Sequence, residues 1–430
     1  MSHSHPRDLP GWLAYIEQQH PQAIALGLDR VARVRDAMGL APAVPVIIVG
    51  GTNGKGSTCA MLESILDAAG YRVGLYTSPH LLHYNDRVRI ARRQADDAAL
   101  VAAFARVEAA RCASGGDNRL TYFEFGTLAA MDLFLRAGVD VLVLEVGMGG
   151  RLDAVNAFDA DCAVITSISL DHVDYLGATR EAIGYEKAGI VRAGRPAVVA
   201  VPAAPASVLR HVQTVGARLL LIGRDFGWEK GRRDWTFRGP GGSATGLPYP
   251  ALRGEIQLQN ASGALAALAT LSEELPLPAN ALRQGLAAVA LPGRFQVLAE
   301  RPALVLDVGH NVEAAAVLAQ NLSGLGPCPA TSAVFGMLRD KDIAGVVDLL
   351  ARHIDRWYVC TLPPPRGAPA AALAQALHAA GVGAVREFEN PAQAYAAACG
   401  DSAENDRIVV FGSFHTVADV MAARERHRGP

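Results

Sequence analysis

The stretch IIVGGTNGKGST, residues 47–58, runs from β-branched apolar residues into a glycine-dense turn and then into hydroxyl residues. A buried strand that passes through such a turn into a helix presents backbone N–H groups at the positive end of the helix dipole, which suits a phosphate. Glycines let the backbone approach closely, Lys55 can reach the β- and γ-phosphates, and Ser57 or Thr58 can offer a hydroxyl to Mg²⁺. The stretch therefore predicts a phosphate-binding loop.

This loop departs from the strict G-x-x-x-x-G-K-[ST] pattern. Gly56 separates Lys55 from Ser57, and Val49 occupies the position five before Gly54. The alternative interpretation is a tight strand-to-helix turn with a solvated lysine. Because strand character precedes the turn and helical character follows it, nucleotide binding is favoured.

Short runs rich in Val and Ile recur along the first half of the chain. They are VPVIIVG, VGLYTS, VDVLVLEVG, CAVITSI and RPAVVAV, and alanine-rich stretches of helical periodicity lie between them, such as 57–69, 96–113 and 121–136. Continuous rather than alternating apolar strands, separated by helices, indicate a mainly parallel sheet with helices on both faces. We therefore expect an α/β fold.

The pattern loosens after about residue 200, where residues 228–246 are typical of an exposed hairpin and loops. Helical periodicity returns over 260–289, and Pro292 and Gly293 then break it. Beyond this point the strands ALVLDVGH, SAVFGML, RWYVCTL and RIVVFGSF alternate with helices. We predict domains at 1–291 and 297–430, joined by a linker at 292–296.

Composition narrows the function classes. Of 430 residues, 50% are hydrophobic, and 40 Lys and Arg residues face 42 Asp and Glu residues, so no excess positive charge is available for a nucleic-acid partner. Neither a signal peptide nor an apolar run of roughly 20 residues is evident, which favours a cytoplasmic protein without a membrane partner. The six cysteines form no C-x-x-C pair, and we expect them to be reduced and mostly buried.

Two later strands carry charged residues at their carboxyl ends. VDVLVLE ends in Glu145, which lies near the glycine loop if the two strands are neighbours, and a carboxylate there can coordinate Mg²⁺. SISLDHVDYLG places Asp171, His172 and Asp174 at another strand end. A lone histidine is usually structural, yet this one belongs to a second carboxylate-rich edge. EVGMGG is not G-x-G-x-x-G, so dinucleotide binding is a weak alternative.

Nine segments together resemble the folylpolyglutamate synthase family, in order and approximate spacing and over nearly the whole chain. They are GTNGKGST (51–58), TSPHL (77–81), LEVGMGGRLDAVN (144–156), SLDHVDYLG (169–177), EKAGI (186–190), LPGRFQ (291–296), DVGHN (307–311), DKD (340–342) and GSFHTVA (412–418). The resemblance implies a Mur-ligase architecture, in which a P-loop ATPase domain precedes a smaller, Rossmann-like α/β domain. It also implies a ligase that uses ATP and an acyl phosphate to join L-glutamate to a folate-type carboxylate.

The segments LGLDRV (26–31) and TYFEFGT (121–127) look like the dihydropteroate-binding segments of bifunctional bacterial members of this family. Such members add glutamate to dihydropteroate and to tetrahydrofolate, so the resemblance implies both acceptors. A monofunctional folylpolyglutamate synthase is the alternative. The resemblance also suggests a monomer.

The resemblance further implies ligands for ATP and for two Mg²⁺ ions. The implied ATP contacts are Thr52, Asn53, Gly54, Lys55, Gly56, Asn260, Arg294 and Asp307. The implied metal ligands are Ser57 and Glu145 for one ion, and Ser78, Glu145 and His172 for the other. Taken alone, a serine before a proline commonly just caps a turn.

Lys187 matches a family lysine that CO₂ converts to a carbamate. An ammonium repels Mg²⁺, whereas a carbamate is an anion with oxygen ligands; unmodified, Lys187 could instead contact phosphate directly. The implied catalytic residues are Lys187, His172, Glu145 and His310, and the implied glutamate contacts are His310 and Ser413.

The implied pterin site draws on three segments. Its residues are Ala25, Leu26, Gly27, Leu28, Thr121, Tyr122, Phe123, Glu124, Leu152, Asp153 and Ala154. An aromatic ring can stack on a flat heterocycle, and a carboxylate can accept its N–H and amino donors. Tyr122 and Phe123 could equally be core residues.

Some positions depart from the family pattern. Gly309 and Val312 change the usual DGAHNP or DVAHNP segment, Val155 replaces a common threonine, and Asp86 replaces a glutamate. We expect the start of the helix after residue 311 to be affected more than the site.

Three other function classes compete. A P-loop GTPase would need a guanine-reading N-K-x-D segment, which the sequence lacks. A cell-wall Mur ligase would carry an additional domain before the glycine loop, where this chain has few residues. A binding protein without catalysis would be expected to lose metal ligands, and all four candidates are present.

Overall fold

The computed structural model describes residues 6–22, 24–115 and 118–428. Its residues form two compact units, Met1–Ala251 with Leu258–Val289, and Leu252–Gln257 with Ala290–Pro430. The change of unit at 289–290 lies beside Pro292 and Gly293. Residues 252–257, which the sequence places in the first domain, group instead with the second, because Gly254 lies so close to Asn321 that a Cβ would come within 2.7 Å of its side chain.

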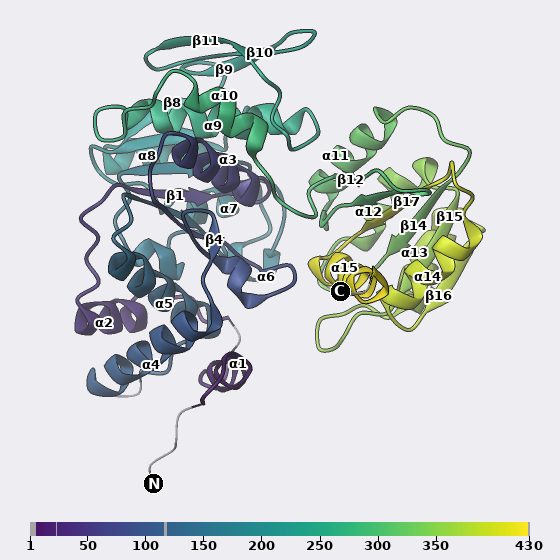
Figure 1. Ribbon diagram of the computed structural model, residues 1–430, viewed down its shortest axis with the longest axis horizontal. Coiled ribbons are helices and arrows are strands. Elements are labelled where there is room, and N and C mark those ends of the chain that lie inside the picture. Colours follow the sequence, from purple (N-terminus) through teal and green to yellow (C-terminus); the bar gives the residue numbers. More distant parts are fainter. Residues whose placement is uncertain (1–5, 23, 116–117, 429–430) are drawn as a thin grey trace. The chain divides into compact units, whose positions relative to one another are not determined.

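The first unit is built on an 8-stranded sheet in the order β4-β3-β2-β5-β1-β6-β7-β8. Strands β2 and β5 to β8 pair in parallel around β1, and β3 and β4 add antiparallel pairs at one edge (Figure 1). The bounds are β1 Val46–Gly50, β2 Val73–Tyr76, β3 Val88–Ile90, β4 Arg93–Gln94, β5 Val141–Glu145, β6 Cys162–Ile165, β7 Pro196–Val199 and β8 Arg218–Leu221. The predicted mainly parallel α/β fold is confirmed.

Helices cover both faces of this sheet. In Figure 1, α3, α9 and α10 lie on one side of the sheet and α4 and α5 on the other. The bounds are α1 Leu9–Glu17, α2 Asp29–Met38, α3 Lys55–Ala68, α4 Asp97–Ala113, α5 Tyr122–Ala137, α6 Val173–Leu176, α7 Arg180–Ala188, α8 Ala206–Val215, α9 Ile256–Thr270 and α10 Ala281–Ala288, with 3-10 turns η1 Tyr84–Arg87 and η2 Ala154–Ala157. One core cluster joins buried side chains of the sheet to helices such as α1, α2, α4 and α5, while buried side chains of α3, α9 and α10 lie outside this cluster.

Two stretches differ from the sequence prediction. Residues expected as an exposed hairpin form a 3-stranded antiparallel sheet of β9 Gly227–Lys230, β10 Trp235–Gly239 and β11 Gly242–Leu247. Trp235 is fully buried there, and its indole N–H donates to the carbonyl of Pro248. The single helical stretch predicted over 260–289 is two helices, because Pro276 and Pro278 fall between α9 and α10.

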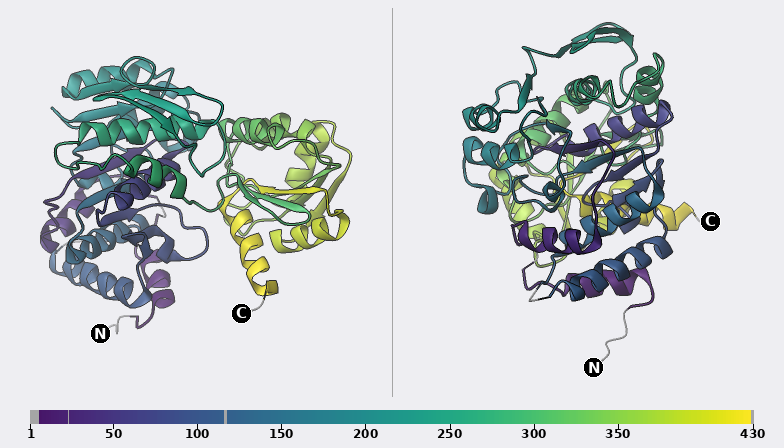
Figure 2. Two further views of the ribbon diagram at one scale, coloured as in Figure 1. Left: turned by 45° about the horizontal axis from the view of Figure 1, so that its top comes forward. Right: turned by 90° about the vertical axis from the view of Figure 1, so that its left-hand side faces the viewer.

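The second unit has a 6-stranded sheet in the order β12-β13-β17-β14-β15-β16, with β12 antiparallel to β13 and the other pairs parallel. Its strands are β12 Gln296–Leu298, β13 Ala303–Leu306, β14 Thr331–Phe335, β15 Arg356–Cys360, β16 Val385–Phe388 and β17 Arg407–Phe411. Its helices are α11 Val312–Ser323, α12 Ile343–Leu350, α13 Ala370–Ala379, α14 Pro391–Asp401 and α15 Phe414–Arg428, with the 3-10 turn η3 Ala351–His353. Figure 2 shows helices on both faces of this sheet.

Two further expectations concern residue chemistry. All six cysteines are free, but only three of them are buried, two are partly buried and Cys112 is exposed, so fewer are buried than the sequence predicted. Among the described residues, no helix is both long and apolar enough to cross a membrane.

Candidate active site

The glycine loop leaves the buried central strand β1 and enters α3. Gly51 has φ +147°, and a Cβ there would come within 1.9 Å of the Thr166 hydroxyl. Gly54 has φ +84°, and a Cβ there would come within 2.4 Å of the amide oxygen of Asn260. Both positions therefore require glycine, and the second brings the predicted ATP contact Asn260, from α9, directly against the loop.

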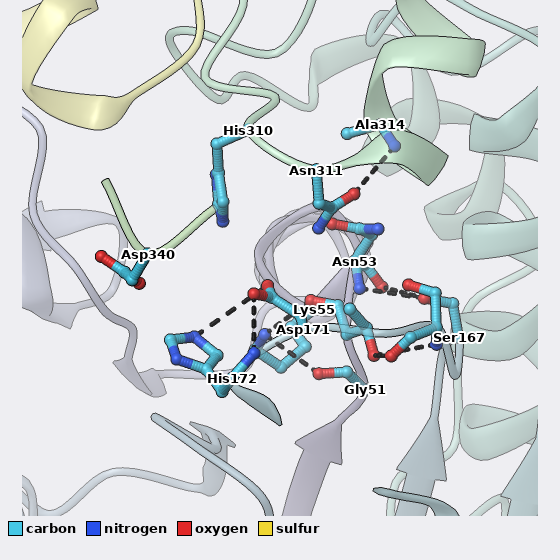
Figure 3. Close-up of polar contacts among 12 residues, drawn as sticks. Gly51, Asn53, Lys55, Ser167, Asp171, His172, His310, Asn311, Ala314 and Asp340 are labelled. Carbon is cyan, nitrogen blue, oxygen red and sulfur yellow. Dashed lines mark hydrogen bonds and ion pairs between the residues drawn. The ribbon is translucent and has the colours of Figure 1, made fainter. Parts of the chain in front are cut away.

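The segment that follows β6 forms one wall of this loop (Figure 3). The N–H of Thr52 donates to the carbonyl of Ser167 over 2.9 Å, and the N–H of Asn53 donates to the Ser167 hydroxyl over 2.9 Å. The Thr166 hydroxyl donates to the carbonyl of Asn53, and the N–H of Ser169 donates to the Thr52 hydroxyl. The sequence prediction missed these three wall residues, Thr166, Ser167 and Ser169, although the three hydroxyl residues of TSIS (166–169) after an apolar strand are a signal for them.

Lys55 is the first residue of α3, and its ammonium folds back across the loop. Nζ donates to the carbonyls of Gly51 and Thr52 over 3.1 and 3.0 Å, as Figure 3 shows for Gly51. Its positive charge is therefore held above the turn, where loop N–H groups and the helix N-terminus also favour an anion.

Strand register brings Glu145 to the same edge. Val49 of β1 lies opposite Glu145 of β5, and Glu145 is 5% exposed. The N–H of Ser78, just after β2, donates to Oε2 of Glu145 over 3.1 Å. Ser57, 3% exposed, lies in the first turn of α3. The sequence prediction that Glu145 neighbours the glycine loop therefore agrees with the sheet order.

The buried thiol of Cys59 feels both the carboxylate of Glu145 and the ammonium of Lys55. Burial raises the pKa of Cys59 well above its ordinary value, the carboxylate of Glu145 raises it further, and Lys55 opposes the shift. Hydroxyl and carboxylate oxygens are the donors Mg²⁺ prefers, so the chemistry of Ser57, Ser78 and Glu145 fits such an ion. Within the described residues, no group of three or more His, Cys, Asp and Glu residues is placed to hold a metal ion.

His172 lies just before α6 with the left-handed φ of +51°. Its N–H donates to Oδ1 of Asp171 over 2.9 Å, and its ring Nε2 lies 4.0 Å from Oδ2 of the same carboxylate (Figure 3). Because a non-glycine residue rarely adopts this backbone conformation, the arrangement is a specific one, and it projects from the segment that continues the loop wall.

Lys187 is buried in the last turn of α7, with 4% of the residue exposed. The loop after β5 packs directly on this helix: the N–H of Arg151 donates to the carbonyl of Glu186, and its guanidinium pairs with the Glu186 carboxylate at 2.8 Å. A Cβ at Gly150 would come within 2.9 Å of that same carbonyl, so the approach depends on glycine. Lys187 is thus fixed relative to the strand that carries Glu145.

The three segments predicted to bind pterin lie together in the first unit. Phe123 packs on Gly147, whose Cβ would lie 2.8 Å from the ring, and its centroid is 5.7 Å from that of Tyr76. The N–H of Gly27 donates to the carbonyl of Leu152 over 3.3 Å. Tyr122 and Phe123 are partly buried, so each retains some accessible surface while packing on the core.

Asp153 is the buried acid of this group. Its carboxylate accepts from the N–H groups of Met148 and Val155 over 2.9 and 3.1 Å. Burial raises its pKa to about 7, against the opposing effect of these N–H donors and of Lys55. A carboxyl that titrates near neutral pH can accept from pterin N–H donors when ionised.

The second unit brings its own predicted residues to the carboxyl ends of β13 and β17. Asp307 accepts from the N–H groups of Phe295 and Gly309 over 2.9 and 2.7 Å, and burial raises its pKa. The Arg294 guanidinium lies 4.9 Å from the ring centroid of Phe414 and acts on Asp307 to lower that pKa.

His310 and Ser413 belong to the same edge. The His310 ring Nδ1 lies 2.9 Å from the carbonyl of Val308, and Ser413 is 3% exposed, with its hydroxyl accepting from the N–H of His415. The expected disturbance from the departures at 309 and 312 is not observed, because α11 begins at Val312 and the Asn311 side chain caps it (Figure 3).

Comparison with known protein families assigns both halves of the chain. Residues 49–225 match the Mur ligase middle domain, and residues 293–414 match the Mur ligase glutamate ligase domain. The dihydrofolate synthase/folylpolyglutamate synthase of Escherichia coli (strain K12) is 46% identical over 421 residues, which cover 98% of this chain and 96% of that protein.

Solved structures are similar over the same length. E. coli FolC in complex with DHPP and ADP gives a TM-score of 0.94 at 45% identity, covering 100% of both chains. A bifunctional folylpolyglutamate synthase/dihydrofolate synthase with Mn, AMPPNP and L-glutamate bound gives a TM-score of 0.90 at 45% identity, covering 99% of this chain and 100% of that one.

Proposed function

The chain belongs to the dihydrofolate synthase/folylpolyglutamate synthase family of Mur ligases, and we propose that it adds L-glutamate both to dihydropteroate and to tetrahydrofolate. It is an ATP-dependent, amide-forming ligase that uses a divalent cation. The observation that carries the proposal is the sheet register, which sets the glycine loop, Glu145 and the segment before His172 at one edge of the first unit.

The chemistry explains why such a site suffices. An amine does not displace oxide from a carboxylate, so one carboxylate oxygen of the acceptor attacks the γ-phosphorus of ATP and ADP leaves. The amine of glutamate then attacks the resulting acyl phosphate, inorganic phosphate leaves with that oxygen, and an amide remains. Both steps need alignment and charge neutralisation more than a protein nucleophile.

The chain's own groups divide this work. Thr52, Asn53, Gly54, Lys55 and Gly56 hold the triphosphate through loop N–H groups and the lysine ammonium, with Asn260 packed behind. Ser57 and Glu145 hold one Mg²⁺, while Ser78, Glu145 and His172 hold a second. These ions neutralise phosphate charge when bound.

Lys187 is proposed to carry a carbamate formed with CO₂. Lys187 is 4% exposed, and a carbamate on it would provide oxygen donors for a cation. The modification therefore converts a poor neighbour of Mg²⁺ into a ligand or orienting group.

The dihydropteroate site comprises the three segments around Phe123 and Asp153, including Ala25, Leu26, Leu28 and Ala154. Stacking on Phe123 and hydrogen bonding to Asp153 suit a flat heterocycle with N–H donors. In the second unit, Arg294 and Asp307 are proposed as nucleotide ligands, and His310 and Ser413 as glutamate ligands. We propose a monomer, which the resemblance to this family suggests.

The direct test is to incubate the purified protein with MgATP, L-glutamate and either acceptor, and to follow ADP release together with product mass. Addition of glutamate to both acceptors is the expected result. Extension of tetrahydrofolate alone would establish the monofunctional alternative, and no product from either acceptor would overturn the proposal.

A further inference from the structure

A partly buried ion pair connects two of the segments that form the proposed dihydropteroate site. Arg30, in the first turn of α2, donates from Nη2 to the carbonyl of Ala25 over 2.7 Å and to Oε1 of Glu124 over 2.9 Å, with a longer contact from Nε to Oε2. One acceptor is the backbone carbonyl of Ala25 in the 25–28 segment, and the other is the side chain of Glu124 in α5.

The side chain of Glu124 is also fixed by hydrogen bonds to Thr121. Glu124 is 3% exposed, and its Oε2 accepts from the N–H of Thr121 over 2.8 Å, while its own N–H donates to the Thr121 hydroxyl. This reciprocal capping box sets the first turn of α5, which also carries Tyr122 and Phe123. Arg30 therefore holds the backbone of Ala25 at a fixed position relative to the first turn of α5.

Besides Arg30, the 25–28 segment is held at Leu28, whose carbonyl accepts from the N–H of Ala32 over 2.8 Å and whose side chain packs on the core. Gly27 donates its N–H to Leu152 over 3.3 Å, and Leu26 is 36% exposed. A guanidinium is planar and can hold two acceptors at a fixed separation, which a lysine ammonium cannot do in the same way.

We infer that Arg30 is a positioning residue for dihydropteroate: it sets the 25–28 segment against the first turn of α5 without itself reacting. The inference rests on the proposed function, which assigns both segments to dihydropteroate. Loss of Arg30 frees the segment and leaves a buried carboxylate without this partner, so binding of that acceptor weakens while phosphoryl transfer at the glycine loop keeps its geometry.

The test compares Arg30→Ala, Arg30→Lys and the full-length wild type with both acceptors at saturating MgATP and glutamate. For Arg30→Ala we expect KM for dihydropteroate to rise roughly tenfold, with kcat and the tetrahydrofolate constants within about twofold of wild type. Arg30→Lys keeps the positive charge but not the planar guanidinium, so its KM for dihydropteroate should lie between those of wild type and Arg30→Ala.

Arg106→Ala is the matched control. Arg106 pairs with Asp132 of the same helix α5 at similar exposure, 33% and 5% against 27% and 4%, although Asp132 keeps Arg136 as a second partner. This variant should lose comparable thermal stability without a selective change in KM. Pterin fluorescence titration of each protein measures acceptor binding independently of turnover.

Equal losses with both acceptors, the same pattern in Arg106→Ala, or an unchanged KM in Arg30→Ala would each overturn the positioning role. If Arg30→Ala does not fold, a wild-type KM in Arg30→Lys would overturn it as well. Failure of the wild type to bind or use dihydropteroate would instead remove the proposed function, and the inference with it.

Discussion

The N–H of Ser78 donates to Oε2 of Glu145 over 3.1 Å, joining the residues that follow β2 to the last residue of β5. Because β5 lies between β2 and β1, this bond fixes a carboxylate beside the start of the glycine loop. A hydrogen bond from backbone is not lost when side chains change, so the carboxylate's position is largely set by the sheet itself.

Replacing Glu145 by Gln should therefore abolish catalysis while preserving the fold. The amide keeps the shape but loses the charge that a cation needs, and we expect ADP release to fall roughly 100-fold or more. Asp140→Asn is the control, since Asp140 precedes the same strand at its opposite end, is exposed and accepts only from the N–H of Arg72 among the bonds described. Turnover near wild type in Glu145→Gln would exclude a metal role.

Gly54→Ala should impair nucleotide binding more than stability. Gly54 and Gly70 flank α3, and both have left-handed φ, +84° and +94°. A Cβ at Gly54 would meet Asn260, whereas at Gly70 it would meet nothing within 4 Å. Each variant should lose about 1 kcal/mol of stability from strain, but KM for ATP should rise roughly tenfold for Gly54→Ala alone. Equal KM values in the two variants would contradict the contact.

Asp153 gives a pH-dependent prediction. Its pKa in the folded protein is about 7, above the ordinary 3.8, so the folded state retains a proton that the unfolded chain releases. This stabilisation is complete below the unfolded pKa and is lost as pH rises toward 7. Relative to Asp153→Asn, the wild-type free energy of unfolding should drop by roughly 2 kcal/mol between about pH 5 and about pH 8. Urea titrations that run parallel across this range would show that the acid is not perturbed.

Lys187→Ala should lose glutamate addition, and added bicarbonate or acetate should restore part of it, because a small carboxylate can occupy the vacated position. Carbon NMR with labelled bicarbonate should show a carbamate signal in wild type that is absent from the variant. Lys230→Ala, at the exposed end of strand β9, should keep both the signal and the activity. Unchanged turnover in Lys187→Ala would refute the role.

The local part of the fold could be predicted because each strand and the glycine loop lie in continuous sequence. Val46–Gly50 is fully buried. Its apolar run, the glycines after it and the helix that follows can each be recognised from a few consecutive residues. The sequence also predicted Glu145 at a strand end, close to the glycine loop if the two strands are neighbours. The structure pairs β5 directly with β1, the strand that leads into the loop.

Contacts between distant segments could not be predicted in this way. Ser167 binds Asn53 across 114 positions, and Arg30 binds Glu124 across 94. Each depends on how the sheet and helices pack, and neither residue type is unusual in its own stretch. Trp235 was missed for the same reason, since polar and glycine neighbours surround a side chain that packing buries completely.

Oxygen transfer tests most directly whether ATP activates the acceptor as an acyl phosphate at this site. Tetrahydrofolate labelled with ¹⁸O in its glutamate carboxylates is converted with MgATP and L-glutamate, and the inorganic phosphate released is examined by mass spectrometry. Phosphate that carries one carboxylate oxygen per amide formed is the predicted result. Unlabelled phosphate from a reaction that still yields the amide would contradict the mechanism.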